Sequence, residues 1–276
     1  MKHQLNVRPP LCAAALAALV LAPAPARAQF QPRPLNDLAT GESYHIEFST
    51  ALWIPTAGMS VSSEALGQTP TLIDFKQDLG LTDHNFPDLH LVLRPSAGNK
   101  FRVQLIPITY TQNGAPQRSI VFNGQRYSVN VPVSSTLQWK AYRFGYEYDF
   151  VRLNRGFGGF IVEAKYTDVQ VQLQSPVANE FAHAQAPIPA IGGIGRAYVM
   201  PNIAATVEVT GFKLPDHLVK NDQAHYVDFD VYGTLNFSDN FGVQGGYRSL
   251  DVGYVIKSDT GTFTLRGPYF GAVVRY

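Results

Sequence analysis

The last ten residues, GPYFGAVVRY (Gly267–Tyr276), form an alternating stretch that closes on an aromatic residue. In an extended strand, alternate residues point to opposite faces, so one face carries Phe270, Ala272, Val274 and Tyr276. The other face carries Tyr269, Gly271, Val273 and Arg275. Because the final residues of most domains fray, we interpret a patterned strand at this position as a signal that another component reads.

The same period-two alternation continues backward to Tyr44, and no period of 3.6 persists for three turns. It predicts ten strands: Ser43–Trp53, Pro87–Arg94, Lys100–Thr111, Ser135–Val151, Gly158–Leu173, Pro189–Met200, Ile203–Phe212, His225–Ser238, Phe241–Lys257 and Thr262–Tyr276. Several exceed the usual strand length and match the roughly 9 to 11 residues of a tilted membrane-spanning strand.

The predicted connections alternate in length. Short turns fall at Ser96–Asn99, Asn154–Gly156, Pro201–Asn202 and Ser238–Asn240. The opposite side carries Pro55–Phe86, Gln112–Ser134, Gln174–Ile188, Lys213–Ala224 and the short Ser258–Gly261. This layout favours an all-β fold, a transmembrane antiparallel barrel of about ten strands (eight to twelve) with short periplasmic turns and long extracellular loops.

The first 28 residues have the features of a secretory signal peptide. Lys2 and Arg8 precede the apolar run Leu11–Ala22, and an Ala-x-Ala site ends at Ala28. We therefore expect a signal peptide at 1–28, a periplasmic linker at 29–42 and the barrel at 43–276. Cleavage removes the only cysteine, Cys12, and leaves 19 basic residues against 21 acidic ones, so nucleic acid is not expected as a partner.

At this point the sequence resembles the outer-membrane β-barrel proteins of Gram-negative bacteria. Their last strand also alternates and ends in an aromatic residue, here Tyr276 in place of the more usual Phe. The resemblance implies an outer-membrane location, reached through the periplasm, with outer-membrane lipid and the barrel-assembly machinery as partners. It also implies that Phe270, Ala272, Val274 and Tyr276 act as the assembly signal. Small OmpW-like barrels are the nearest comparison, and a monomer is expected.

The polar faces of the strands predict a charged lumen. The predicted lining residues are Glu47, Arg94, Arg102, Arg143, Glu147, Asp149, Glu163, Lys165, Arg196, Glu208, Asp228, Asp230, Arg248, Asp251 and Arg275. Tyr232 and Tyr269 are also predicted to point inward. Acids and bases nearly balance, which fits either a lined pathway or a lumen filled by ion pairs, and a barrel near eight strands is narrow enough for side chains to fill.

Two long loops have unusual compositions. Thr71–Phe86 has apolar residues spaced for one or two amphipathic helical turns, which would either plug the mouth or pack on the rim. Its acids lack the spacing of a calcium loop, so no metal is expected. The apolar, glycine-rich segment Ala182–Gly195 suggests an opening for a hydrophobic ligand or a loop lying against its neighbours.

The leading functional hypothesis is a non-enzymatic barrel without cofactor that gives narrow or hydrophobic-solute passage, or has an envelope role. The alternative is a rim hydrolase acting on lipid or peptide, with His84, His183 and His217 as candidate residues. Sequence does not show whether these loops converge, and no hydrolase motif supports them.

Overall fold

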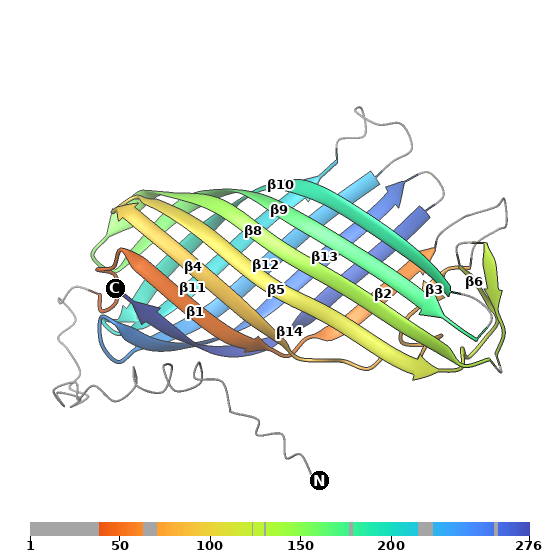
Figure 1. Cartoon of the computed structure of the whole chain (residues 1–276). Helices are drawn as coiled ribbons and strands as arrows, with labels where there is room; N and C mark the ends of the chain where they lie inside the picture. Colours follow the sequence, from red (N-terminus) through yellow and green to blue (C-terminus); the bar gives the residue numbers. More distant parts are fainter. Residues whose placement is uncertain are drawn as a thin grey trace, which may run out of the picture. The chain divides into compact units, whose positions relative to one another are not determined.

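The computed structural model describes residues 39–62, 71–122, 124–129, 131–176, 179–214, 223–256 and 259–276. The predicted signal peptide, most of the predicted linker and His217 lie outside the described residues. Long tilted strands make up nearly all of the described chain (Figure 1). None of its described segments is a helix long and apolar enough to cross a membrane.

Ten strands form the wall of a closed barrel. They are β1 (Ile46–Trp53), β4 (Phe86–Ser96), β5 (Asn99–Gly114), β8 (Val133–Leu153), β9 (Gly156–Gln174), β10 (Asn179–Met200), β11 (Ile203–Lys213), β12 (Gln223–Asn236), β13 (Phe241–Ile256) and β14 (Asp259–Arg275). Each pairs antiparallel with its neighbours, and β14 pairs with β1 to close the ring. The predicted ten-stranded antiparallel barrel is confirmed.

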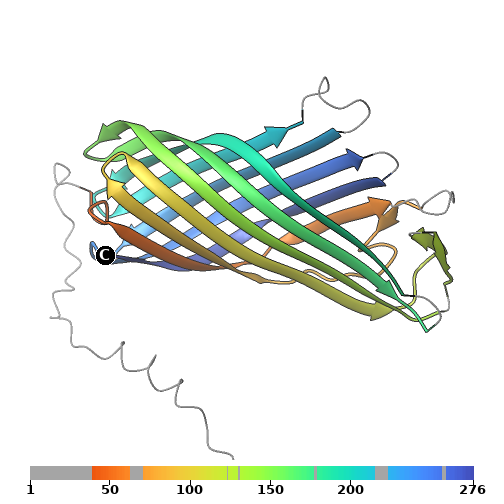
Figure 2. The same ribbon diagram turned by 45° about the horizontal axis from the view of Figure 1, so that its top comes forward.

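The two ends of the barrel differ in their connections, as predicted. One end, here called the short-turn end, carries the tight turns after β4, β8, β10 and β12. The other, the loop end, carries four further short strands: β2 (Thr56–Ser62), β3 (Ile73–Asp74), β6 (Ile120–Phe122) and β7 (Gln125–Tyr127). Figures 1 and 2 show the β6–β7 hairpin at this end, beyond the tips of the long strands.

Two segments predicted to be loops are partly strands in the structure. The segment 56–62 is strand β2, which continues β1 after a bend at Pro55 and pairs with Thr260–Arg266 of β14. Residues 179–188 belong to β10, although Pro187 and Pro189 look like strand breakers in the sequence. Proline is tolerated where its missing N–H faces an unpaired strand edge, and β10 has such an edge here.

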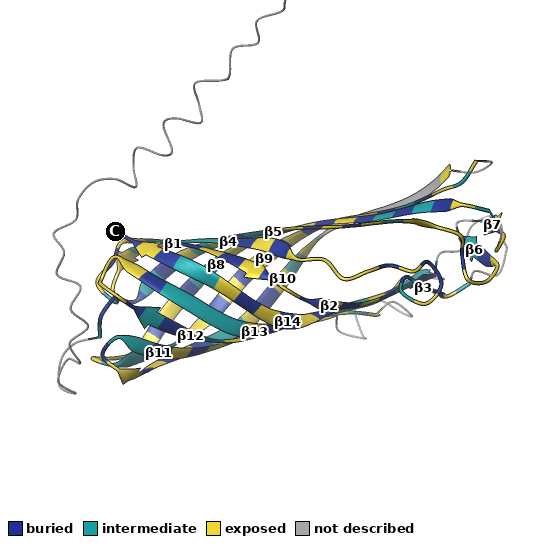
Figure 3. Ribbon diagram, turned by 90° about the horizontal axis from the view of Figure 1, so that it is seen from below, coloured by how far each residue is buried: buried dark blue, intermediate teal, exposed yellow. Residues whose placement is uncertain are grey.

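Side chains alternate between the outer face and the interior along every long strand, as the burial colouring of Figure 3 shows. The outer face is apolar, with exposed residues such as Phe144, Val162, Val207 and Phe229. Six aromatic residues near the short-turn end are exposed on this face: Phe101, Phe150, Phe160, Phe237, Phe241 and Tyr276. An apolar exterior around a closed ring satisfies the requirements of a strand array in hydrocarbon.

The wall is continuous near the short-turn end and divided near the loop end. β4 reaches only to Leu105 of β5, and β11 reaches only to Ile191 of β10. Beyond these points β5, β8, β9 and β10 continue as one sheet, while β12, β13, β14 and β2 form a second. Figure 3 shows the two sheets facing each other toward the loop end.

Candidate functional site: an apolar cavity above an ion-paired lumen

The short-turn half of the lumen is filled by charged side chains that pair with one another. At its centre, Asp228 accepts hydrogen bonds from Arg248 at 2.6 and 2.9 Å. The same carboxylate lies 3.2 Å from Arg143 and 3.5 Å from Lys165. All four side chains are at most 10% exposed, so three cations surround one acid in the middle of the barrel.

The network reaches across the lumen from wall to wall. Arg143 of β8 also pairs with Glu163 of β9 at 2.8 Å and Glu208 of β11 at 3.0 Å. Arg102 of β5 bridges Glu208 at 2.5 Å and Glu147 at 3.0 Å. Because successive ion pairs link strands from opposite sides of the ring, their side chains fill the space that an aqueous pathway needs.

The same pairing continues toward the short-turn end. Lys100 lies 2.6 Å from Glu147 and 2.9 Å from Asp149. Arg275 donates to Glu47 at 2.5 Å. These pairs form a second charged layer, nearer to the short-turn end than Asp228.

Residues Ala39–Glu42 bind the turns and the inward side chains at the short-turn end. Glu42 accepts hydrogen bonds from Arg196 at 2.9 Å and from Tyr198 at 2.8 Å, and it also pairs with Arg94. Backbone hydrogen bonds join Ala39 to Asn154 and Thr40 to Pro201. The end of the predicted linker therefore contributes to the filled lumen.

Fourteen of the fifteen predicted lining residues lie on the inner face, and one does not. The inward set comprises Glu47, Arg94, Arg102, Arg143, Glu147, Asp149, Glu163, Lys165, Arg196, Glu208, Asp228, Asp230, Arg248 and Arg275. Asp251 lies on the outer face, opposite the outward Val227, and pairs there with His225 and Arg266. The register of β13 is unbroken between Arg248 and Asp251, so residues three apart fall on opposite faces.

The two predicted inward tyrosines also face the lumen. The hydroxyl of Tyr269 donates to Asp230 at 3.0 Å, and the rings of Tyr232 and Tyr269 are 6.4 Å apart. Tyr232 in turn accepts from Arg196 at 3.3 Å. These contacts connect the aromatic side chains to the charged network.

Sequence reasoning missed four members of the network. Asp88 shares the inward face of β4 with Arg94, and it accepts a hydrogen bond from Arg248 at 3.0 Å. Lys100 and Gln104 share the inward face of Arg102, so strand parity alone could have identified them. Glu42 precedes the first strand, and no pattern in the sequence marks its contribution.

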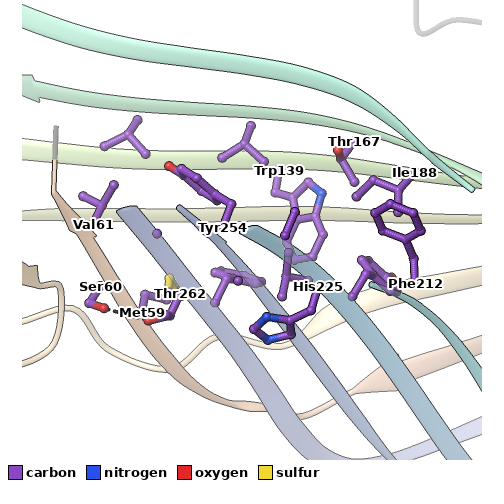
Figure 4. A pocket seen from close by; sticks show the side chains of 18 of the residues that line it. Met59, Ser60, Val61, Trp139, Thr167, Ile188, Phe212, His225, Tyr254 and Thr262 are labelled. Carbon is purple, nitrogen blue, oxygen red and sulfur yellow. Dashed lines mark hydrogen bonds between the residues drawn. The ribbon is translucent and has the colours of Figure 1, made fainter. Parts of the chain in front are cut away.

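An apolar cavity of about 380 Å³ lies on the loop-end side of the charged layers. It sits between the two sheets of the loop end (Figure 4). One sheet contributes Leu137, Trp139, Val169 and Ile188, and the other contributes Met59, Tyr226, Val252 and Phe263. The size falls within the usual range of ligand pockets, about 300 to 1,000 Å³.

The ring of Tyr226 lies between the cavity and the charged network. Lys165 Nζ lies 3.9 Å from the ring centre of Tyr226, which lines the cavity. Arg248 lies 5.4 Å from the ring centre of Trp53. These cation–π contacts stabilise buried cations on one side of each ring and leave the other side of Tyr226 to an apolar space.

Few polar groups reach the cavity. The hydroxyls of Ser60 and Thr262 bond to each other at 2.7 Å, as the dashed line in Figure 4 shows. His225 borders the cavity, but its ring binds Asp251 on the outer face at 2.9 Å. The indole Nε1 of Trp139 is buried and has no hydrogen-bond partner within the described ranges, although the ring itself packs edge-on against Phe263 at 4.4 Å.

The loop Thr71–Phe86 both lines the cavity and packs against the next loop at the rim. Phe75 lines the cavity, and its N–H donates to Met59 of β2 at 3.1 Å. Two hydrogen bonds, Asp78 to Asp74 and Gly80 to Lys76, form one helix-like turn. Arg118 of the next loop binds Asp78 at 2.6 and 2.8 Å. This guanidinium holds the pKa of the Asp78 carboxyl below its ordinary value.

The three candidate histidines are not brought together in the described part of the chain. The ring of His84 lies edge-on to Tyr110 at 5.9 Å. His183 is opposite Gln170 in the β9–β10 ladder, and His217 is outside the described residues. Within the described ranges, no group of three or more His, Cys, Asp or Glu side chains is placed to hold a metal ion.

Comparisons with known proteins give structural similarity only. Neither protein-family models nor curated proteins gave a match. The crystal structure of the outer membrane protease OmpT from Escherichia coli is similar with a TM-score of 0.54 and 8% identity, covering 88% of this chain and 100% of that one. The Pseudomonas putida toluene transporter TodX has a TM-score of 0.35 and 9% identity, covering 87% and 92%.

At such low identity these similarities establish the fold and no activity, and the weaker one supports no further argument. The chain has the fold of a small outer-membrane β-barrel, with ten strands closed into one ring. Its apolar exterior agrees with an integral outer-membrane protein.

Proposed function

We propose that the protein binds a neutral apolar molecule in the loop end of an outer-membrane barrel whose lumen is closed to ions. The supporting observation is the stacking of an apolar cavity directly on a filled, ion-paired lumen. On this proposal the short-turn end faces the periplasm after signal-peptide cleavage, and the cavity lies toward the cell exterior. Assembly through the terminal strand and a monomeric state belong to the same proposal.

The lining of the cavity selects for a neutral ligand. Its walls are mostly aliphatic and aromatic side chains, and moving a charged group from water into such surroundings is strongly unfavourable without a paired partner. The cations nearest the cavity are already paired with acids below Tyr226. An apolar solute gains from burial of its surface at about 25 cal/mol per Å².

Passage of ions through the lumen is disfavoured by the same arrangement. An ion would have to displace paired side chains such as Arg143, Asp228 and Arg248 that are already desolvated. The rim-hydrolase hypothesis has weaker support, because His84, the one candidate histidine whose side chain is described, contacts the ring of Tyr110.

A neighbouring pair of variants tests the binding site. Val169 points into the cavity, whereas Gln170 is exposed on the outer face. We expect Val169→Trp to fill the cavity and Gln170→Trp to leave it open. The refolded proteins in lipid vesicles would be exposed to adamantyl diazirine, a neutral apolar photoreactive probe, and the labelled residues mapped by mass spectrometry.

The expected result is labelling of inward residues around the cavity in the wild type and in Gln170→Trp, reduced at least tenfold in Val169→Trp. Labelling of outer-face residues by probe dissolved in the lipid provides an internal standard in every sample. Equal labelling of the cavity in both variants, or none in the wild type, would contradict the proposal. A parallel planar-bilayer recording should show insertion without conductance steps.

A further inference from the structure

β10 has a free edge at the level of the cavity. Asn179–Ala190 pair with β9, but pairing with β11 ends at Ile191 opposite Gly211. β11 itself ends at Lys213. No other strand within the described ranges pairs with Asn179–Ala190 on that side.

The sequence of β10 fits an unpaired edge. Pro187 and Pro189 are two residues apart, so their nitrogen atoms face the same edge of the strand. The ladder to β9 continues without a register shift through both prolines, which fits an orientation of their nitrogen atoms toward the free side. Proline supplies no N–H there, so this edge leaves fewer unpaired donors than an ordinary strand would.

The free edge borders the cavity directly. Ile188 of β10 lines the cavity from one side of the gap, and Phe212 and Leu214 line it from the end of β11. Figure 4 shows Ile188 and Phe212 at the same end of the cavity. The space between β10 and β11 is thus flanked by apolar side chains that also belong to the binding site.

The outer face changes from apolar to polar at this level. Just below the gap, Ile191 is 70% exposed and Val209 is 45% exposed. Along the gap, the outward positions of β10 are Pro189, Pro187 and then Gln185, and the last outward position of β11 is Lys213. The lower edge of the gap is therefore at the upper limit of the apolar band, where the hydrocarbon of the outer leaflet would end.

The wall also divides between β4 and β5, and there side chains cover the division. Beyond the end of β4, the inward side chains Ile106, Ile108 and Tyr110 of β5 are at most 2% exposed. Phe86 packs against Tyr110 at 5.2 Å, and Phe75 belongs to the same buried cluster. The first long loop fills that division, whereas the described residues show no equivalent cover at the edge of β10.

Building on the proposed function, we infer that neutral apolar solutes dissolved in the outer leaflet pass laterally between β10 and β11 into the cavity. This route takes the solute from the hydrocarbon past the outward Ile191 and Pro189 to the apolar side chains that line the cavity. Passage from the loop end would instead require it to leave the membrane and cross water.

A reversible bridge across the gap tests this route. The predicted mature chain has no cysteine, so Ile188→Cys with Leu214→Cys gives a unique thiol pair, closed as a disulfide or with a short bifunctional thiol reagent. The control pair, Gly195→Cys with Val207→Cys, joins the same two strands where they are already paired. Vesicles preloaded with adamantyl diazirine are mixed with each protein, and cavity labelling is followed over time.

Bridging Ile188→Cys to Leu214→Cys should slow the filling of the cavity at least tenfold, and cleaving the disulfide should restore the rate. The control bridge should leave the rate unchanged. If the bridged and reduced proteins fill equally fast, lateral passage is wrong and the solute uses the loop end. If the cavity is unlabelled in the wild type as well, the proposed binding function itself fails.

Discussion

The two halves of the lumen have the same strands and the same alternation, yet they are built in opposite ways. Between Tyr226 and the short-turn end, inward positions carry charges that pair across the closed barrel. On the loop-end side of Tyr226, inward positions are apolar, and the wall divides into two sheets that enclose a cavity. The contrast teaches that alternation specifies which side chains face inward, while pairing of the strands decides whether the interior is filled or hollow.

Charges are accommodated in the lower half because each has partners from other strands. Leaving one buried charge without its partner is far more costly than removing the whole group. The upper half has no such requirement, since its apolar surfaces are complete without specific partners. We therefore expect the lower half to respond sharply to single charge removals and the upper half to respond mainly through binding.

The largest effect is expected for Asp228→Asn. This change leaves Arg248, Arg143 and Lys165 facing a neutral side chain, and removing one member of a buried ion network costs about 3–5 kcal/mol. Urea unfolding in lipid vesicles, followed by tryptophan fluorescence, measures the loss. The control is Asp230→Asn, which keeps an acceptor for Tyr269 and should cost less than about 1.5 kcal/mol. Equal losses would show that Asp228 is not the centre of the network.

A smaller effect is expected at the boundary between the halves. Tyr226→Leu keeps the boundary apolar but removes the ring beneath which Lys165 lies, a contact worth about 0.5–2 kcal/mol. Tyr226→Phe retains the ring and should be nearly neutral in the same unfolding measurement. If the two variants behave alike, the ring does not stabilise the cation and the boundary is only steric.

The smallest effect is expected at the loop end, where Arg118 binds Asp78. The hydrogen bonds from Arg118 lower the folded-state pKa of Asp78 below the ordinary value near 3.8. The pair therefore stabilises the loop above that pH, and its contribution is lost as pH falls through the lower, folded-state pKa. Hydrogen exchange of residues 71–85, corrected for intrinsic rates, should show protection falling in acid. In Asp78→Asn it should be low throughout, and an unchanged profile would contradict the role of the pair.

Sequence predicted the barrel well because the bilayer imposes simple rules. Ten segments, their order and the alternating turn lengths follow from period-two patterning and short polar turns. Toward the loop end, beyond the apolar band, the bilayer no longer imposes these rules on the sequence. The errors in the predicted strands are found there. Pro55 concealed β2 by bending the chain, and Pro187 and Pro189 concealed the upper half of β10.

The charged network was largely predictable and the cavity was not. Inward parity identified Arg143, Glu208 and Asp228, and applying it more strictly would have added Lys100 and removed Asp251. The cavity depends on where β11 stops and how far two sheets separate, which are distances between segments remote in sequence. The apolar character of Ala182–Gly195 was the one local sign of it.

The segment Ala39–Glu42 has a consequence for the order of assembly. Its partners lie in the turns after β8, β10 and β12: Asn154, Pro201 and Asp239. Glu42 also needs Arg94 from β4 and Arg196 from β10. Its docking site therefore does not exist until strands from across the whole chain are in place. We therefore expect this segment to dock last, and its protection from a protease added on the short-turn side would time the completion of the barrel.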